Sequence, residues 1–423
     1  MKKHRWRMRM SWSRLLLWVF ASCVAGFYTI LWFRSNPGDE HPLSTATGGT
    51  TRAGARPRGK TSVSIIVPAR NEERNIRRVI TSLLEQDFGN YEVIVVDDAS
   101  TDATPRILDD IARTHPHANR LYVLRLRDLP PGWAGKPHAL QAGAKEAQGD
   151  WLLFTDADTW HAPNALRIAV ETATRDCLDM LSLGTTQELP DFWGKVLMPM
   201  AYMGITMQYP PKQVNDPNSK LALANGQFIL LRRSVYELLG GYARPDLRDT
   251  LLDDRDLARV FKDNGYRLRL VDGRGLVRVR MYQGFRDAWR GWRKNVFLGS
   301  RGGLPFVSLQ LLGLPLFIVF PFFLPLLALL RRGKRETPRA VTPAELTAAS
   351  VLSLGPLLAY RVWVNKNLGV PWYYALTQPL AGAVFEGILA QSTWRILTGK
   401  GVDWRGRAYY NGHKAGKGES LHP

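Results

Sequence analysis

The sequence has few cysteines and lacks the spacing of a metal-binding cysteine or histidine motif. Only two cysteines occur among 423 residues, Cys23 inside an apolar run and Cys177 elsewhere. Two thiols exclude a disulfide framework and fit a reducing compartment. A glycine-rich turn, G-x-G-x-x-G, is also missing after the first expected strand. The chain reads PARNEE there, which excludes a dinucleotide-binding dehydrogenase.

Negative charge is scarce relative to positive charge. The chain has 37 Asp and Glu against 57 Lys and Arg, a net charge of +20. Such an excess suits nucleic acid, anionic lipid headgroups or a phosphorylated substrate. Much of it lies beside long apolar runs, so we expect a membrane partner and no nucleic acid. With 45% hydrophobic and 22% charged residues, the chain is neither disordered nor a pure membrane bundle.

Two long runs carry no charge. Leu15–Phe33 has 19 residues after a basic start, which predicts an anchor and not a signal peptide. Leu304–Leu330 has 27, but prolines at 305, 315, 321 and 325 indicate a broken or re-entrant course. Two weaker candidates, 346–364 and 370–391, each contain one charged residue. We expect three or four membrane segments.

Strands and helices alternate between Ser62 and Gly303. Apolar, β-branched runs predict four strands, near 61–70, 91–98, 121–126 and 151–155. Amphipathic stretches between them predict helices near 72–86, 100–114 and 136–147, the first capped by Asn71. This alternation predicts a mostly parallel sheet covered by helices. Ligands of such sheets bind beyond the carboxyl ends of the strands.

Polar clusters stand at three of these strand ends: Pro68 to Glu72, Asp97 with Asp98, and Asp156 with Asp158. In WLLFTDADTW a strand that reads as buried runs into two carboxylates, which need water or a cation. Mg²⁺ and Mn²⁺ prefer such oxygen ligands. Side chains two apart on a strand point to opposite faces, so the chain must turn at Ala157 for both to reach one ion. Two solvated acids are the alternative, and His161 reads as a loop histidine more than as a further ligand.

These motifs resemble the family 2 inverting glycosyltransferases with the GT-A fold. SIIVPARNEE, VIVVDDASTDAT, GKPHALQAGAKEAQGDWLLFTDADT and LLDDRDLAR occur in that family's order, over about 62–295. PPGWAGKPHAL, MYQGFRDAWRGWRKN and DWRGRAYY resemble a narrower group, the membrane enzymes that glycosylate carotenoid acids, hopanoids and other lipids. The resemblance implies a GT-A α/β domain with N-terminal and C-terminal transmembrane helices.

The same resemblance assigns roles to the acids of the donor site. Asp158 contacts a Mg²⁺ or Mn²⁺ ion, and Asp156 contacts the metal or the nucleotide. Asp97 and Asp98 read the nucleoside. The opposite wall of the pocket and the rest of the nucleotide-sugar site are assigned to Pro68, Arg70, Glu72, Lys136 and Asp253.

Lys136 stands at a predicted helix start, where a cation and backbone N–H groups suit a diphosphate. Asp254 carries over as the general base of an inverting transfer, with aspartate replacing the family's glutamate at Asp253. If the acceptor is a carboxylic acid, it is already ionised and Asp254 positions it. The alternatives are a solvated lysine and acids that favour a helix N-terminus.

The basic, aromatic stretch MYQGFRDAWRGWRKNVF predicts an interfacial helix that could also close over the diphosphate. Arg290 and Trp292 are its candidates for contacting the acceptor or the diphosphate. Processive polysaccharide synthases carry Gln-x-x-Arg-Trp in this region. Here Gln283 and Arg286 are kept, but Asp287 replaces the tryptophan, which counts against a processive synthase.

We expect six regions: a basic segment and anchor (1–34), a flexible linker (35–61), the catalytic domain (62–283), an interface helix (284–303), transmembrane or re-entrant segments (304–392) and a basic tail (393–423). The region 188–211, rich in Met and aromatics, lines an acceptor groove or forms an interfacial helix or core.

The expected function is transfer of a hexose from a nucleotide diphosphate, UDP by family habit or GDP, to a lipid acceptor such as a carotenoid, hopanoid or polyisoprenoid. The alternatives are a processive polysaccharide synthase and a non-catalytic nucleotide-binding scaffold. A nucleotide-sugar donor places the catalytic domain of this multi-pass membrane protein on the cytoplasmic side. The clusters of Lys and Arg, however, favour the opposite orientation under the positive-inside rule.

Overall fold

The computed structural model describes residues 11–36, 43, 61–296, 303–333, 337 and 340–398, with the backbone of 402–404 and 407–409. The chain divides into two compact units. The first combines Met1–Asn36, Asp191–Gln208 and Ser300–Gln391, and the second combines Pro37–Pro190, Tyr209–Gly299 and Ser392–Pro423. The segment predicted as one catalytic domain therefore contributes 191–208 to the first unit. The predicted domain boundaries stay predictions.

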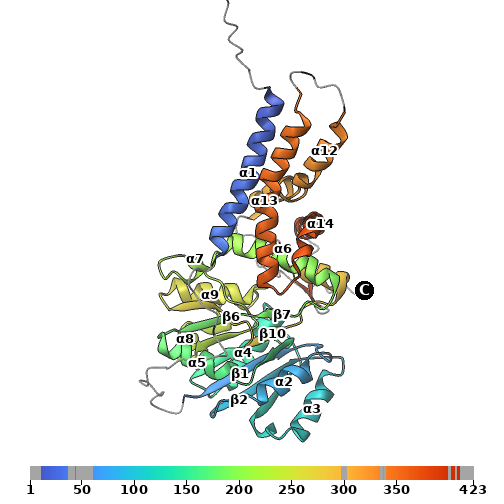
Figure 1. Cartoon of the computed structure of the whole chain (residues 1–423). Helices are drawn as coiled ribbons and strands as arrows, with labels where there is room; N and C mark the ends of the chain where they lie inside the picture. Colours follow the sequence, from blue (N-terminus) through green and yellow to red (C-terminus); the bar gives the residue numbers. More distant parts are fainter. Residues whose placement is uncertain are drawn as a thin grey trace, which may run out of the picture. The chain divides into compact units, whose positions relative to one another are not determined.

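The second unit is built on a seven-stranded sheet with the order β3-β2-β1-β4-β8-β6-β9 (Figure 1). Its strands are β1 Val63–Ala69, β2 Tyr91–Asp98, β3 Leu121–Leu126, β4 Trp151–Phe154, β6 Met180–Gly184, β8 Ile229–Arg232 and β9 Leu268–Asp272. All neighbouring pairs are parallel except those that β8 makes with β4 and β6. The predicted mostly parallel sheet is confirmed.

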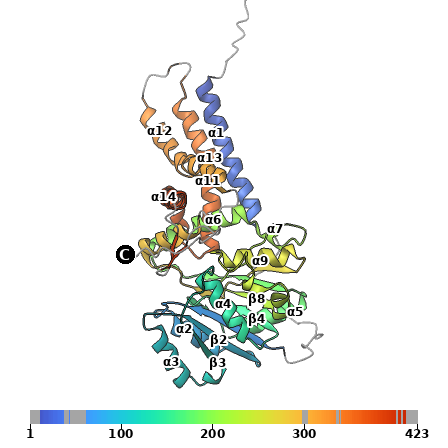
Figure 2. The ribbon, with the colours of Figure 1, turned by 180° about the vertical axis from the view of Figure 1, so that it is seen from behind.

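Helices cover both faces of this sheet because its strands are apolar on both sides. One face packs on α2 Ile76–Leu84, α3 Thr104–Thr114 and α5 Ala165–Arg175. The other packs on α4 Gly135–Glu146, α8 Arg233–Leu238 and α9 Asp253–Asp263 (Figure 2). Alternate β1 residues serve the two layers, Ile65 the first and Ile66 the second.

Shorter elements complete this unit. A second sheet has the order β5-β10-β7, formed by β5 Thr159–His161, β7 Thr186–Gln187 and β10 Val277–Val279. The remaining elements are η1 Ala118–Arg120, α7 Pro211–Asn215, η2 Gly241–Ala243, α10 Gly284–Asn295, β11 Val402–Trp404 and β12 Arg407–Tyr409. Strand β5 begins directly after the turn that follows β4. The acids of this turn, Asp156 and Asp158, are therefore held between two strands.

The first unit consists of long apolar helices and one crossing helix. Its elements are α1 Trp12–Ser35, α6 Phe192–Gln208, α11 Gly303–Leu314, η3 Pro315–Val319, η4 Phe320–Phe322, α12 Phe323–Arg331, α13 Pro343–Asn367, η5 Trp372–Thr377 and most of α14 Gln378–Leu397. In both views α6 crosses the lower ends of α1 and α13 (Figure 1, Figure 2). Ser35 at the end of α1 bonds the Tyr360 hydroxyl of α13 at 2.6 Å.

Three of the described helical stretches are long and apolar enough to cross a membrane: Trp12–Ser35, Gly303–Arg331 and Pro343–Asn367. The second is interrupted by a π-helical turn at Pro315–Val319 and a 3₁₀ turn at Phe320–Phe322. The predicted break at the prolines is thus present, because proline cannot donate the helical hydrogen bond. Most of the linker and most of the tail lie outside the described residues.

One predicted helix start is wrong. Asn71 does not cap α2; it has a φ of +55° and lies outside the helix, which begins at Ile76. The N–H groups of 71–73 instead donate to side chains of the loop before α3 and of its first residue; Glu72 N, for example, donates to Thr104 Oγ1 at 2.8 Å. Tertiary partners replaced the local cap, so the helix starts a turn later.

Candidate active site

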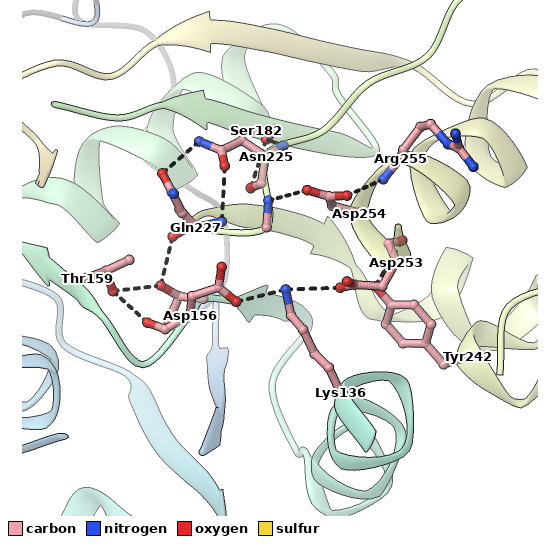
Figure 3. Close-up of polar contacts among 12 residues, drawn as sticks. Lys136, Asp156, Thr159, Ser182, Asn225, Gln227, Tyr242, Asp253, Asp254 and Arg255 are labelled. Carbon is pink, nitrogen blue, oxygen red and sulfur yellow. Dashed lines mark hydrogen bonds and ion pairs between the residues drawn. The ribbon is translucent and has the colours of Figure 1, made fainter. Parts of the chain in front are cut away.

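Lys136 lies between two carboxylates at the centre of the second unit. Its ammonium Nζ is 2.8 Å from Asp156 Oδ1 and 3.1 Å from Asp253 Oδ2 (Figure 3). Helix α4 begins at Gly135, one residue before the predicted start, and it presents Lys136 from its first turn. Asp156 comes from the end of β4 and Asp253 from the first residue of α9. The lysine thus supplies positive charge next to the acids of the WLLFTDADTW motif.

The charges in this cluster are strongly coupled to one another. Burial opposes the charge of Lys136, but Asp156, Asp253 and Asp254 outweigh it and raise the lysine pKa well above its usual range. Burial and repulsion by Asp253 raise the pKa of Asp254 to about 6, with Lys136 and two backbone N–H groups opposing the rise. At neutral pH Asp254 is therefore ionised but close to its pKa, as a general base requires.

Two backbone donors fix the Asp254 carboxylate. Oδ2 accepts from Gly226 N at 3.0 Å and Oδ1 accepts from Arg255 N at 2.7 Å (Figure 3). The third acid of the motif has another role, because Asp256 accepts from the Thr250 hydroxyl and from Arg255 Nε. Asp256 thus matches the alternative of an acid in the first turn of a helix, whereas Asp253 and Asp254 face the cluster.

The sequence LANGQF supplies site residues that sequence reasoning missed. A Cβ on Gly226 would stand 2.9 Å from Lys136 Nζ, 3.4 Å from Asp254 Oδ2 and 3.6 Å from Asp156 Oδ2, so these groups surround its Cα. Neighbouring Asn225 anchors the loop, with its N–H donating to Ser182 Oγ at 2.8 Å. A glycine between two amides after an apolar run was the available signal.

Gly226 also helps to line a pocket. The pocket's lining includes Lys136, Leu140, Phe154, Thr155, Asp156, Gly226, Ile229, Tyr242 and Asp253. Burial, with repulsion from Asp253 and neighbouring groups, raises the pKa of Tyr242, which keeps its hydroxyl neutral. That hydroxyl donates to the Asp253 carbonyl at 3.4 Å and so supports the start of α9.

The chain turns between β4 and β5, as the paired acids require. Thr159 Oγ1 donates to the Asp156 carbonyl at 2.8 Å, and Ala157 is buried inside the turn. Asp156 and Asp158 both act on the Tyr282 hydroxyl, whose pKa is raised mainly by burial and further by these acids. His161 Nε2 instead bonds the hydroxyls of Thr155 and Thr159, each at 3.0 Å.

Burial lowers the pKa of His161 to about 3, so this ring stays neutral. The histidine therefore holds the turn, but it lies in strand β5 and not in a loop as the sequence predicted. No group of three or more His, Cys, Asp or Glu side chains that could hold a metal occurs among the described residues.

A second polar cluster forms where β1 and β2 end. The parallel register sets Ala69 beside Asp97, and Arg70 Nη1 donates to the Asp98 carbonyl at 2.6 Å. Asp97 Oδ1 accepts from Ser100 N at 3.1 Å. The side chains of Glu72, Asp97 and Asp98 are buried at this edge, and Pro68 is the penultimate residue of β1. The predicted wall residues are therefore gathered at the carboxyl ends of adjacent strands.

Helix α10 contributes a cation that was not predicted. Trp292 is buried, with its ring 5.9 Å from that of Tyr282, whereas Arg290 is exposed. The Lys294 ammonium interacts with Asp253, Asp156 and Asp254. Burial lowers the pKa of Lys294, and repulsion by Lys136 adds to this effect. Lys294 was inconspicuous in the sequence because three other cations stand on the same helix.

Residues 64–240 match the family described as Glycosyl transferase family 2. This part of the chain is therefore similar to family 2 glycosyltransferase domains; it has a GT-A-like α/β fold, with long apolar helices on both sides of it in the sequence. This class agrees with the resemblance found in the motifs.

Two curated relatives carry the same name, 4,4'-diaponeurosporenoate glycosyltransferase. The protein of Staphylococcus aureus is 25% identical over 358 residues, which cover 82% of this chain and 88% of that protein. The protein of Staphylococcus haemolyticus is 25% identical over 259 residues, which cover 59% of this chain and 65% of that protein. This chain is thus distantly related to carotenoid-acid glycosyltransferases.

Solved structures also resemble this chain. A mannosyltransferase of Pyrobaculum calidifontis, in complex with GDP-Man and Mn²⁺, has a TM-score of 0.48 and 20% identity, covering 91% of this chain and 98% of that one. S. aureus TarS (residues 1–349) in complex with UDP-GlcNAc has a TM-score of 0.38 and 16% identity, covering 79% and 92%.

Proposed function

We propose that this protein is a membrane-bound inverting glycosyltransferase that moves a hexose from a nucleotide diphosphate, UDP by preference, to a hydrophobic lipid acceptor. The observation that carries the proposal is the carboxylate of Asp254, which two backbone N–H groups hold beside the ion pairs of Lys136. A base with a pKa of about 6 is hydrogen-bonded to Gly226, which lines a pocket together with the cation Lys136. The distant likeness to carotenoid-acid glycosyltransferases supports the lipid acceptor.

In the proposed step the acceptor oxygen bonds to the anomeric carbon while the bond from that carbon to the diphosphate oxygen breaks. Asp254 accepts the proton of an acceptor hydroxyl, and the N–H groups of Gly226 and Arg255 keep its carboxylate in place. If the acceptor is a carboxylate, no proton moves and Asp254 orients it. Lys136 and Lys294 lie among the acids and would bind the departing diphosphate.

Asp156 and Asp158 fit a divalent cation in their chemistry. Two carboxylates at one turn leave the remaining positions to diphosphate oxygens and water, which is the usual way in which Mg²⁺ is bound with a nucleotide. A bound Mg²⁺ or Mn²⁺ would supply positive charge against the leaving diphosphate. Asp97, Asp98, Arg70 and Glu72 lie at the neighbouring strand ends, where we place the nucleoside.

We place the catalytic domain on the cytoplasmic side, because the cell makes nucleotide sugars there. The retained Asp158 and Asp254 speak against a non-catalytic scaffold, and Asp287 at the place of the synthase tryptophan speaks against a processive synthase. Asp287 accepts from Gln283 N at 3.0 Å and so begins α10, a role for which tryptophan has no acceptor.

The test is transfer of radiolabelled sugar from a panel of UDP- and GDP-sugars into extractable lipid, using membranes with Mg²⁺, with Mn²⁺ or with a chelator. Metal-dependent label in the organic phase, from one donor of the panel, is the expected result. Label confined to insoluble polymer would replace the proposal with the polysaccharide synthase. Donor binding without transfer to any extracted lipid would favour the scaffold.

A further inference from the structure

Arg361 is a fully buried cation in the first unit. It lies in α13, one of the helices long enough to cross a membrane, and its side chain is 0% exposed. Its Nη2 donates to the Val196 carbonyl of α6 at 2.9 Å. Its Nε and Nη1 have no acceptor, and within the part of the chain that the structure describes no carboxylate pairs with it.

Such an arrangement requires an anion. A guanidinium stays charged in any protein environment, so Arg361 cannot escape by losing a proton. A buried charge without a counter-charge is strongly destabilising, and intramembrane arginines normally pair or mark a ligand site. The N–H groups of Nε and Nη1 are left without an acceptor, and the oxygens of a phosphate accept such charge-assisted hydrogen bonds.

Two amides beside Arg361 add acceptors to the site. Asn365 is one turn further along α13 and therefore on the same face, and Gln378 is the first residue of α14. Both side chains are 0% exposed, and the side-chain oxygen of each has no donor. Tyr28 of α1 interacts with both Gln378 and Arg361, so the three groups gather in one place. A ligand here needs anionic oxygens and also a hydrogen-bond donor.

The depth of the site matches lipid headgroups. Arg361 is six residues before the end of α13, about 9 Å at the rise of an α-helix. The connection that follows, η5, exposes Trp372 and Tyr373, which is typical of the boundary between membrane and water. Asn365 Nδ2 donates to the Pro371 carbonyl of this connection at 3.3 Å, so the amide and the aromatic boundary lie together.

We propose that Arg361 binds the phosphate of a membrane lipid, with Asn365 and Gln378 accepting from a hydroxyl or ammonium group of the same headgroup. Phosphatidylglycerol and phosphatidylethanolamine carry both kinds of group, and a polyisoprenyl phosphate carries a P–OH. Phosphatidylcholine lacks the donor, and a fatty acid lacks the phosphate. Val196 and Met200 of α6 close the site on one side, Met200 Sδ lying 3.6 Å from Gln378 Nε2.

The test is native mass spectrometry of the full chain, purified in mild detergent, on wild type, Arg361→Met, Gln378→Glu and the control Arg34→Met. Arg34 is an exposed arginine at the end of α1. Wild type and Arg34→Met should retain about one phosphate-bearing lipid per chain, because the site holds a single guanidinium. The Gln378→Glu variant places a carboxylate of the protein itself beside Arg361. This variant should therefore fold, remain stable and retain no such lipid, even if Arg361→Met fails to fold.

The mass of the retained lipid distinguishes a glycerophospholipid from a polyisoprenyl phosphate, and either supports the site. A second measurement follows unfolding of delipidated protein in vesicles of phosphatidylglycerol or phosphatidylcholine. Wild type should melt at a higher temperature in phosphatidylglycerol, and this difference should vanish in Gln378→Glu. Equal lipid retention by wild type and Gln378→Glu, or no retained lipid and no vesicle preference in wild type, would overturn the proposal in favour of buried water.

Discussion

Replacing Lys136 with methionine should move the acidic limb of the pH–rate profile to higher pH. Burial and repulsion by Asp253 raise the pKa of Asp254 to about 6, and the charge of Lys136 opposes that rise. Without the lysine, ionising Asp254 beside Asp253 becomes harder. Since the base works only when ionised, activity would then require a higher pH.

The structure sets the size of this effect. Lys136 Nζ and Asp254 Oδ2 lie 2.9 and 3.4 Å from the position that a Cβ would take on Gly226, so they are at most about 6 Å apart. Opposite charges at that distance attract by about 2 to 3 kcal/mol at an effective dielectric constant of about 20. This corresponds to about two pKa units. The Lys136 side chain is 33% exposed, and solvent screening reduces the expected shift to about one unit.

The assay is kcat/KM against pH for the donor sugar in detergent solution, because this ratio reports ionisations of the free enzyme. Wild type should lose activity as the pH falls through about 6. Lys136→Met should lose it about one unit higher. Lys136→Arg and the same-helix control Lys145→Met should keep the wild-type limb. A slower Lys136→Met enzyme whose limb coincides with that of wild type would refute the electrostatic coupling.

Three further outcomes are expected. Gly226→Ala places a Cβ 2.9 Å from Lys136 Nζ and should reduce transfer about 100-fold with unchanged melting, whereas Gly89→Ala, with no atom within 4 Å, should leave both unchanged. Gly149→Ala brings a Cβ to 2.5 Å from the Ser64 backbone N and should lower the free energy of unfolding by about 1 to 3 kcal/mol, seen as a lower melting temperature. With Cys23 replaced by alanine, exposed Cys177 should react with a membrane-impermeant maleimide in inverted vesicles and not in intact cells; the reverse pattern would reverse the orientation.

The sequence predicted the parts of the fold that depend on local patterns. Periodic apolar residues predicted β1 to β4, and Lys136 was correctly placed at a helix start. The start of α2 was missed because hydrogen bonds from the loop before α3 replaced a local cap at Asn71. The antiparallel course of β8 depends on strand pairing between distant segments, which no local pattern encodes.

The sequence predicted which residues form the site but not which of them contact one another. Asp156, Asp253 and Lys136 were each identified, but their ion pairs depend on how β4, α9 and α4 meet. Gly226 was not predicted as a site residue, because its role is to leave room for the charged groups of Lys136, Asp156 and Asp254. In the sequence, Arg361 was only the one charged residue of the weaker membrane candidate 346–364. Its burial in the structure showed that it needs a partner.

The measurement that tests the central claim most directly compares Asp254→Asn with Asp263→Asn in sugar transfer and donor binding. Both substitutions lie on α9 and remove one charge, but Asp263 is at its far end, 3.3 Å from Arg259 Nε. Asp254→Asn should lose transfer by at least about 100-fold, the lower range for a general base, while it still binds the nucleotide sugar. Asp263→Asn should keep both activities. Transfer by Asp254→Asn at the wild-type rate would contradict the account.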